Sequence, residues 1–256
     1  MKKKILIVFG LLIAVLVVGV LVALAYLGPL IKKGVETVGP MVTKVDVKLD
    51  SAQVSLLGGS GSLKGLTVGN PAGYKSPDAI KLGEASLAVV PSSVFADKIH
   101  VKSIAIVAPE ITLEGGLKDN NLTIILANVQ EFSGPASTNQ TQSASSQKKL
   151  QVDSVVLSGA KVTANLDMLG NKPLTLTLPD IQLTNLGQGP DGITAGDLTA
   201  RVLDQVINKT LASVTEAATK AGKQMLDSAV NEATKGELKD ATKAVQGVTD
   251  LFKKKK

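Results

Sequence analysis

The segment IHVKSIAI at residues 99–106 decides the fold, because a second version of it, LQVDSVVL, stands at residues 150–157. Polar and apolar residues alternate in both segments, which is typical of a β-strand with one buried face. Both copies also break the alternation at the same place, at Lys102-Ser103 and at Asp153-Ser154. A shared irregularity arises by chance less easily than shared hydrophobicity, so we interpret the two segments as an internal repeat.

The two copies keep a constant offset of 51 residues, which continues into Ile111-Thr112 and Val162-Thr163. We therefore predict a mainly β protein, a repeated antiparallel array that forms a folded-over sheet or groove. Residues 44–132 form the first β repeat and residues 150–190 the second. Between them, residues 133–149 are rich in Ser, Thr, Asn and Gln, and we expect a flexible loop because such a composition buries little apolar surface.

Alternation is most regular in KVDVKLD at residues 44–50. It continues after a shift of one residue near Asp50-Ser51, which predicts a bulge or a break between strands. Turn residues follow at Gly58–Gly61 and in GNPAGY at residues 69–74. Further strands are predicted at residues 80–90, 98–107, 110–114, 121–127, 150–158, 160–168 and 173–186.

Residues Ile5–Leu27 form a run of 23 uncharged, mostly aliphatic residues. As a helix they would span ~34 Å, enough to cross the hydrocarbon core of a bilayer. The lysines of residues 1–4 favour a cytoplasmic N-terminus. We predict an uncleaved anchor with residues 28–43 as its neck, because the run exceeds the ~7–15 apolar residues of a signal peptide. Secretion after cleavage near Ala25 is the alternative.

The pattern changes once more near Gly196, where apolar and small residues recur at steps of three and four up to residue 252. This spacing predicts a long C-terminal amphipathic helix over residues 196–252, with a possible break at Gly236 and a basic tail at residues 253–256. The stripe is rich in Ala and Thr and too poor in Leu for a tight coiled coil.

Composition argues against several classes of function. The chain has no cysteine, which excludes disulfides, thiolate metal sites and a cysteine nucleophile. It has one arginine, Arg201, and only 2% aromatic residues, which is unlike a nucleic-acid-binding protein. The single histidine, His100, is expected on the surface, and the acidic residues are dispersed. We therefore predict no catalytic, cofactor-binding or metal-binding residues, and no enzymatic activity.

One set of apolar residues is expected to share the inner face of the sheet. This face would either hold lipid acyl chains in a groove or form an ordinary core, since one face of such a sheet must be buried. The predicted lining residues are Val45, Val47, Leu49, Leu87, Val89, Ile104, Ile106, Val155, Leu157, Leu174 and Leu176.

The segment GLTVGNPAGY at residues 65–74 resembles the AsmA-like family of bacterial envelope proteins. The resemblance continues through residues 79–85, 98–104 and 108–111 and covers roughly residues 1–185. It implies an N-terminal membrane helix, a folded-over β sheet with an apolar groove, and no catalytic residues. This chain is short for the family and ends in a long helix.

The resemblance implies a protein of the bacterial inner membrane, single pass, with its bulk in the periplasm. We expect a role in lipid handling, such as lipid transport, or in outer-membrane homeostasis. Membrane lipids would be its partners, and an envelope protein could bind the C-terminal helix. The alternative is a structural scaffold that acts through this helix with no lipid-binding role.

Overall fold

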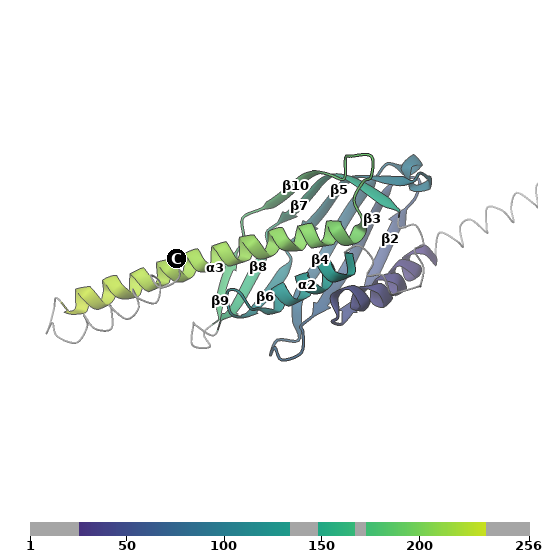
Figure 1. Cartoon of the computed structure of the whole chain (residues 1–256). Coiled ribbons are helices and arrows are strands. Elements are labelled where there is room, and N and C mark those ends of the chain that lie inside the picture. Colours follow the sequence, from purple (N-terminus) through teal and green to yellow (C-terminus); the bar gives the residue numbers. More distant parts are fainter. Residues whose placement is uncertain (1–25, 134–147, 167–172, 234–256) are drawn as a thin grey trace, which may run out of the picture. The chain divides into compact units, whose positions relative to one another are not determined.

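The computed structural model describes residues 26–133, 148–166 and 173–233 of the chain. Ten strands in this part join one curled sheet (Figure 1). A helix covers residues 26–43, and a short 3-10 helix covers Pro91–Phe95. The strands are β1 (Val47–Lys48), β2 (Ser51–Ser55), β3 (Ser60–Gly69), β4 (Asp78–Val89), β5 (Lys98–Val107), β6 (Glu110–Gly115), β7 (Lys149–Ser158), β8 (Lys161–Leu166), β9 (Leu174–Thr177) and β10 (Ile181–Leu186), and the labelled helices are α2 (Asn121–Ser133) and α3 (Ala195–Ala233).

Several of these strands are two halves of one longer strand. β5 and β6 pair with the same edge of β4 in a single register, from Leu87 opposite Ile104 to Ile80 opposite Ile111. The same relation joins β1 to β2, β7 to β8 and β9 to β10. The described sheet therefore consists of six long strands in chain order: β1/β2, β3, β4, β5/β6, β7/β8 and β9/β10.

The two copies of the repeat lie side by side in this sheet. β5 pairs with β7 so that Ile99 lies opposite Leu150, and β6 pairs with β8 so that Ile111 lies opposite Val162. The sequence offset of 51 residues is thus the strand register. These two pairings are parallel, so the expectation of a purely antiparallel array is wrong at the centre of the sheet. A parallel pair needs a long crossover connection, and the chain between β6 and β7 provides it.

Helix α2 lies in that crossover and corrects the strand predicted at residues 121–127. Asn120 caps the helix: its Oδ1 accepts a hydrogen bond from the Thr123 N–H at 3.0 Å, and the Thr123 hydroxyl accepts one from the Asn120 N–H at 3.2 Å. Leu122, Ile125 and Val129 are then buried at helical spacing. The cap outweighs the strand propensity of this apolar run.

A row of breaks crosses the whole sheet, and we call it the transverse break. Gly65, Ala108 and Gly159 adopt positive φ angles of 65°, 47° and 63° there. The spacing of inward side chains changes from two residues to three, as from Leu49 to Ala52, so the same face stays inward on both sides. The break expected near Asp50-Ser51 belongs to this row. Its members lie opposite one another in the strand register: Asp50, Gly65, Gly83, Ala108, Gly159 and Pro179.

The irregularity that the two repeat copies share is also a structural one. The register between β4 and β5 shifts between Ala88 and Val89, which leaves Lys102 as an extra residue in β5. In β7, the buried side chains step by three residues, from Val152 to Val155, across Asp153-Ser154. The sequence-based prediction of a shared phase shift is confirmed.

The inner face of the sheet is apolar and lies against helices. Val101, Val152 and Val155 pack with Leu198 in one buried cluster, which α3 enters through its first turns. Gly39, in the helix of residues 26–43, approaches the Val47 side chain so closely that a Cβ there would overlap it. Figure 1 shows α2 on this face as well, and α2 contacts β6. The predicted neck at residues 28–43 is therefore helical and packed on the sheet.

Helix α3 confirms the predicted C-terminal helix from its start to Ala233. The Thr194 hydroxyl caps its first turn by accepting a hydrogen bond from the Asp197 N–H at 3.0 Å. Residues up to Thr210 belong to the compact unit of the sheet, and later residues form a second unit. The remainder of the helix prediction, Gly236 and the basic tail lie outside the described residues.

The structure does not describe residues 5–25, nor most of the predicted loop at residues 133–149. Within the described ranges, no helix is long and apolar enough to cross a membrane. The anchor therefore remains a prediction from the sequence.

Candidate functional site

All eleven predicted lining residues lie on the inner face, by alternation and register. They do not form one uniform surface. Five of them, on β7 and in or next to β1, are buried, and those on β4, β5 and the edge strand β9 are half-buried. The buried ones are Val45, Val47, Leu49, Val155 and Leu157, and the half-buried ones are Leu87, Val89, Ile104, Ile106, Leu174 and Leu176.

A half-buried aliphatic surface runs across the middle of the inner face, and we call it the central strip. Leu66 lies opposite Leu82 in the register, and Leu87 lies opposite Ile104. The strip extends from β3, which pairs with β1/β2, to β5, and its members Leu87 and Ile104 pack against the buried cluster that includes Leu198 of α3. Its members are Leu63, Leu66, Leu82, Leu87, Ile104 and Ile106. With no polar group of its own, it suits hydrocarbon, and each Å² of apolar surface that it buries is worth ~25 cal/mol.

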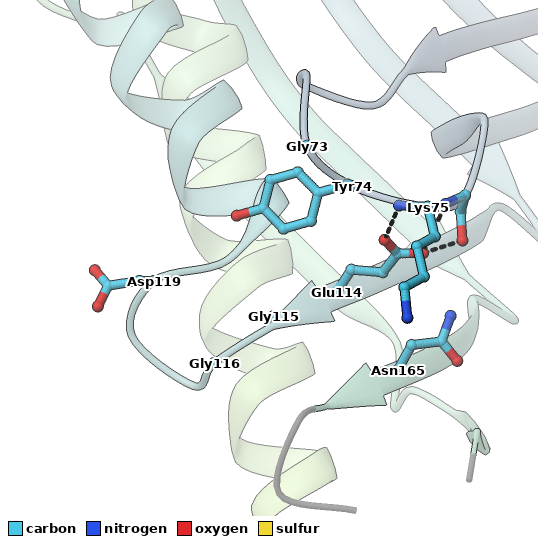
Figure 2. A pocket seen from close by; sticks show the side chains of 9 residues that line it. Gly73, Tyr74, Lys75, Glu114, Gly115, Gly116, Asp119 and Asn165 are labelled. Carbon is cyan, nitrogen blue, oxygen red and sulfur yellow. Dashed lines mark hydrogen bonds between the residues drawn. The ribbon is translucent and has the colours of Figure 1, made fainter. Parts of the chain in front are cut away.

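A second feature lies at the turn of residues 69–78, which carries the family resemblance. A polar cavity of about 580 Å³ opens there beside Glu114 and Asn165 (Figure 2). Asn70 shapes the turn: its side-chain amide donates to the Ser76 carbonyl at 2.8 Å, and its N–H donates to the Pro77 carbonyl at 3.0 Å. Gly73 supplies a φ of 97°, which disfavours other residues.

Glu114, at the end of β6, closes this turn. Its side chain is buried, and its carboxylate accepts hydrogen bonds from the Lys75 N–H at 2.8 Å, the Ser76 N–H at 2.9 Å and the Ser76 hydroxyl. Burial alone raises the pKa of Glu114, but the hydrogen bonds from Ser76, Lys75 and Asn165 outweigh it and lower the pKa below its ordinary value. The group is therefore held as a carboxylate.

Asn121 connects the turn, β6 and α2. Its side chain is fully buried. The amide donates to Asn70 Oδ1 at 2.7 Å and to the Thr112 carbonyl at 2.8 Å, and its Oδ1 accepts from the Glu114 N–H at 2.9 Å. These groups satisfy one another's hydrogen-bonding capacity. We call the turn of residues 69–78 the signature turn, and we call Asn70, Glu114 and Asn121 the clasp, because their hydrogen bonds connect this turn and β6 with α2.

Sequence reasoning missed Glu114 and Asn121. A carboxylate within the otherwise alternating run at residues 110–114 and the pair Asn120-Asn121 before an apolar segment were the available indications. Both depend on pairing with residues 38 to 51 positions away, which spacing alone does not reveal. Within the described ranges, no group of three or more acidic, histidine or cysteine side chains is arranged to hold a metal ion.

His100 lies on the polar face of the sheet, as predicted, and is half-buried. Its Nε2 lies 2.8 Å from Asp153 Oδ2, a partner that the parallel pairing of β5 and β7 brings near. The hydrogen bond with His100 lowers the pKa of Asp153, and the nearby Lys102 contributes. The pair links the two repeat copies beside their shared irregularity.

One family of known proteins matches the part of the chain that contains both the signature turn and the sheet. The model of the AsmA family matches residues 1–183, well over half of the chain. This chain belongs to the AsmA family. The match includes the signature turn and almost the whole sheet, and it ends within β10, before α3. No curated protein and no solved structure matches the chain.

Proposed function

We propose that this AsmA-family protein is anchored in the bacterial inner membrane and handles lipid in the periplasm, in lipid movement or outer-membrane homeostasis. Acyl chains would lie against the central strip. The observation that supports this function is that the strip stays half-buried, although its members Leu87 and Ile104 already pack against the buried cluster that includes Leu198 of α3. An ordinary core would bury such residues fully.

The role that we propose is non-catalytic and needs no cofactor. Aliphatic side chains on a sheet offer shape and apolar surface, which bind hydrocarbon without selecting a reacting group. Membrane lipids are the proposed ligands. The anchor is Ile5–Leu27, and secretion after cleavage near Ala25 stays the alternative.

Photocrosslinking in the full chain tests the proposal. Because the chain has no cysteine, Leu87→Cys can carry a single benzophenone maleimide on the inner face. Ser86→Cys is the matched control, since the adjacent residue points to the opposite, exposed face. After irradiation in native membranes, mass spectrometry should find phospholipid adducts at position 87 in clear excess over position 86. Equal adducts at both positions, or none at position 87 in a folded protein, would contradict the proposal.

A charge within the strip gives an independent test. Ile104→Lys places an ammonium group on a half-buried position and should reduce the lipid that copurifies with the full chain. The same change at Leu157 is a poor test, because that side chain is only 4% exposed and its replacement would disrupt folding. Unchanged lipid content in a folded Ile104→Lys protein would argue for a closed core.

A second candidate function is a scaffold that acts through α3. It is favoured by one observation: α3 continues into a second compact unit after Thr210, beyond the part that matches the family. An envelope protein or another copy of this chain would then bind the later part of the helix.

A further inference from the structure

The helix of residues 26–43 has two apolar faces. Toward the sheet it presents residues such as Ile31, Val35 and Gly39. The eight positions described as exposed contain only one charged residue, Lys33. These exposed positions are Tyr26, Pro29, Leu30, Lys33, Gly34, Thr37, Val38 and Met41. A helix surface that meets water is normally rich in charged and polar residues, so this face is adapted to another environment.

Large apolar side chains dominate the same face. Tyr26, Leu30, Val38 and Met41 are 69%, 66%, 48% and 63% exposed. Their spacing of three to four residues or its multiples aligns them along the helix. Such a contiguous exposed apolar surface is rare on a soluble protein and marks an interaction site.

Helix α2 extends this surface. Asn128 of α2 donates a hydrogen bond to the Thr43 carbonyl at 2.9 Å, and Lys44 pairs with Glu131. Two large apolar residues of α2, Ile124 and Phe132, are also exposed, at 41% and 47%. We define the outer helix face as Tyr26, Leu30, Val38, Met41, Ile124 and Phe132.

We infer that the outer helix face lies on an anionic bilayer surface. The described part of this helix starts at residue 26, at the end of the apolar run Ile5–Leu27, so the proposed anchor would bring Tyr26 to the membrane boundary, the preferred depth of a tyrosine. Residues 26–44 and α2 together contain three lysines and two glutamates, a net charge of +1. Lys32 pairs with Glu36 and Lys44 pairs with Glu131, so Lys33 on the exposed face is the charge that complements anionic headgroups. An apolar helix face with lysines beside it is the pattern of helices that lie within the interface.

This inference rests on the anchor of the proposed function but not on lipid binding by the central strip. It gives the sheet an orientation, with its helix-covered side toward the membrane and its polar side toward the periplasm. The two ideas can therefore fail separately, because the crosslinking at Leu87 and the measurement below report on different faces.

The test is depth-dependent fluorescence quenching of the full chain in nanodiscs of phosphatidylcholine and phosphatidylglycerol. Single cysteines replace Leu30, Val38 or Met41 and carry the fluorophore NBD, and Ser86→Cys is the control on the polar face of the sheet. All four positions are exposed, so the substitutions should leave the fold unchanged. We expect blue-shifted emission at the three helix positions, with stronger quenching by lipids brominated near the headgroup than near the methyl end.

Three results would overturn the inference. Emission and quenching at positions 30, 38 and 41 equal to those at position 86 would place the face in water. A blue shift without bromine quenching, which disappears on dilution to one chain per nanodisc, would assign the face to a second copy. Quenching that is identical in nanodiscs of phosphatidylcholine alone would remove the requirement for anionic lipid.

Discussion

Gly65 fixes the conformation of β3 where the transverse break crosses it. Its φ of 65° disfavours any residue with a Cβ, and a Cβ at this position would overlap the Asp50 carboxylate. Gly65→Ala should therefore lower the free energy of unfolding by at least ~1–2 kcal/mol, the cost of the left-handed conformation alone.

Gly83 provides the matched control, because it lies opposite Gly65 in the register and a Cβ there meets no atom within 4 Å. Gly83→Ala should leave stability unchanged or raise it slightly. Urea unfolding followed by circular dichroism measures both variants. Equal losses in the two would show that the break does not depend on the backbone of Gly65.

Glu114 makes the clasp sensitive to acid. Its pKa in the folded protein lies below the ordinary value of 4.5. The carboxylate therefore contributes its full stabilisation above about pH 4.5, and this contribution is lost as the pH falls through the lowered folded-state pKa. Glu114→Gln should cost ~1–3 kcal/mol at pH 7, since buried donors lose a charged acceptor.

Thermal unfolding between pH 7 and pH 3 tests this prediction. The unsubstituted protein should lose stability below about pH 4.5 more steeply than Glu114→Gln. Glu84→Gln, on the exposed face of β4, should retain the steep dependence. Parallel curves for all three proteins would mean that another group causes the acid sensitivity.

At the scale of elements, α2 shows where sequence patterns mislead. Residues 121–127 are as apolar as the true strands, and the deciding feature is the cap at Asn120. The strands themselves were predictable because alternation reports directly on a sheet with one buried face. The clasp was not, because Asn70, Glu114 and Asn121 meet only after the sheet has formed.

Helix α3 contributes to the fold through its first turns. Leu198, Leu203, Val206 and Ile207 are buried, and after Val214 no further side chain of α3 is buried among those that the structure describes. A chain that ends at residue 196 should therefore fail to fold, whereas a chain that ends at residue 218 should keep its thermal stability.

Expression, circular dichroism and sedimentation of the two truncated chains test this division. If the chain that ends at residue 218 also loses self-association, the scaffold function gains support. Unfolding of that chain would show that the later part of α3 stabilises the sheet.

At the scale of the whole molecule, the sequence predicted the repeat, and the structure adds that its offset is the register of two paired strands and that they run parallel. A constant offset is compatible with several arrangements, and the parallel one depends on the crossover through α2. The prediction of an antiparallel array treated residues 121–127 as a further strand rather than as part of a crossover.

Cysteine pairs can verify the parallel register. Ala105 and Val156 lie opposite each other on β5 and β7. Their spacing of ~4.8 Å suits a disulfide, so the pair Ala105→Cys with Val156→Cys should crosslink on mild oxidation. Ala105→Cys with Ser158→Cys adds two residues of displacement, for a separation of about 8 Å, and should not crosslink. Gel mobility of the oxidised proteins distinguishes the two pairs, and the reverse result would exclude this register.

Residues 51 positions apart in the two repeat copies lie opposite each other in the sheet, and this relation affects how such a protein can evolve. A third copy of 51 residues inserted after β8 would pair with β7/β8 in the same way that β7/β8 pairs with β5/β6. Its free edge would have the sequence pattern of β7/β8, with which β9/β10 already pairs. Duplication would thus widen the sheet by ~4.8 Å at each step and leave both borders intact. In this architecture the sheet can therefore gain one long strand for each added repeat of 51 residues, and no new kind of strand pairing is required.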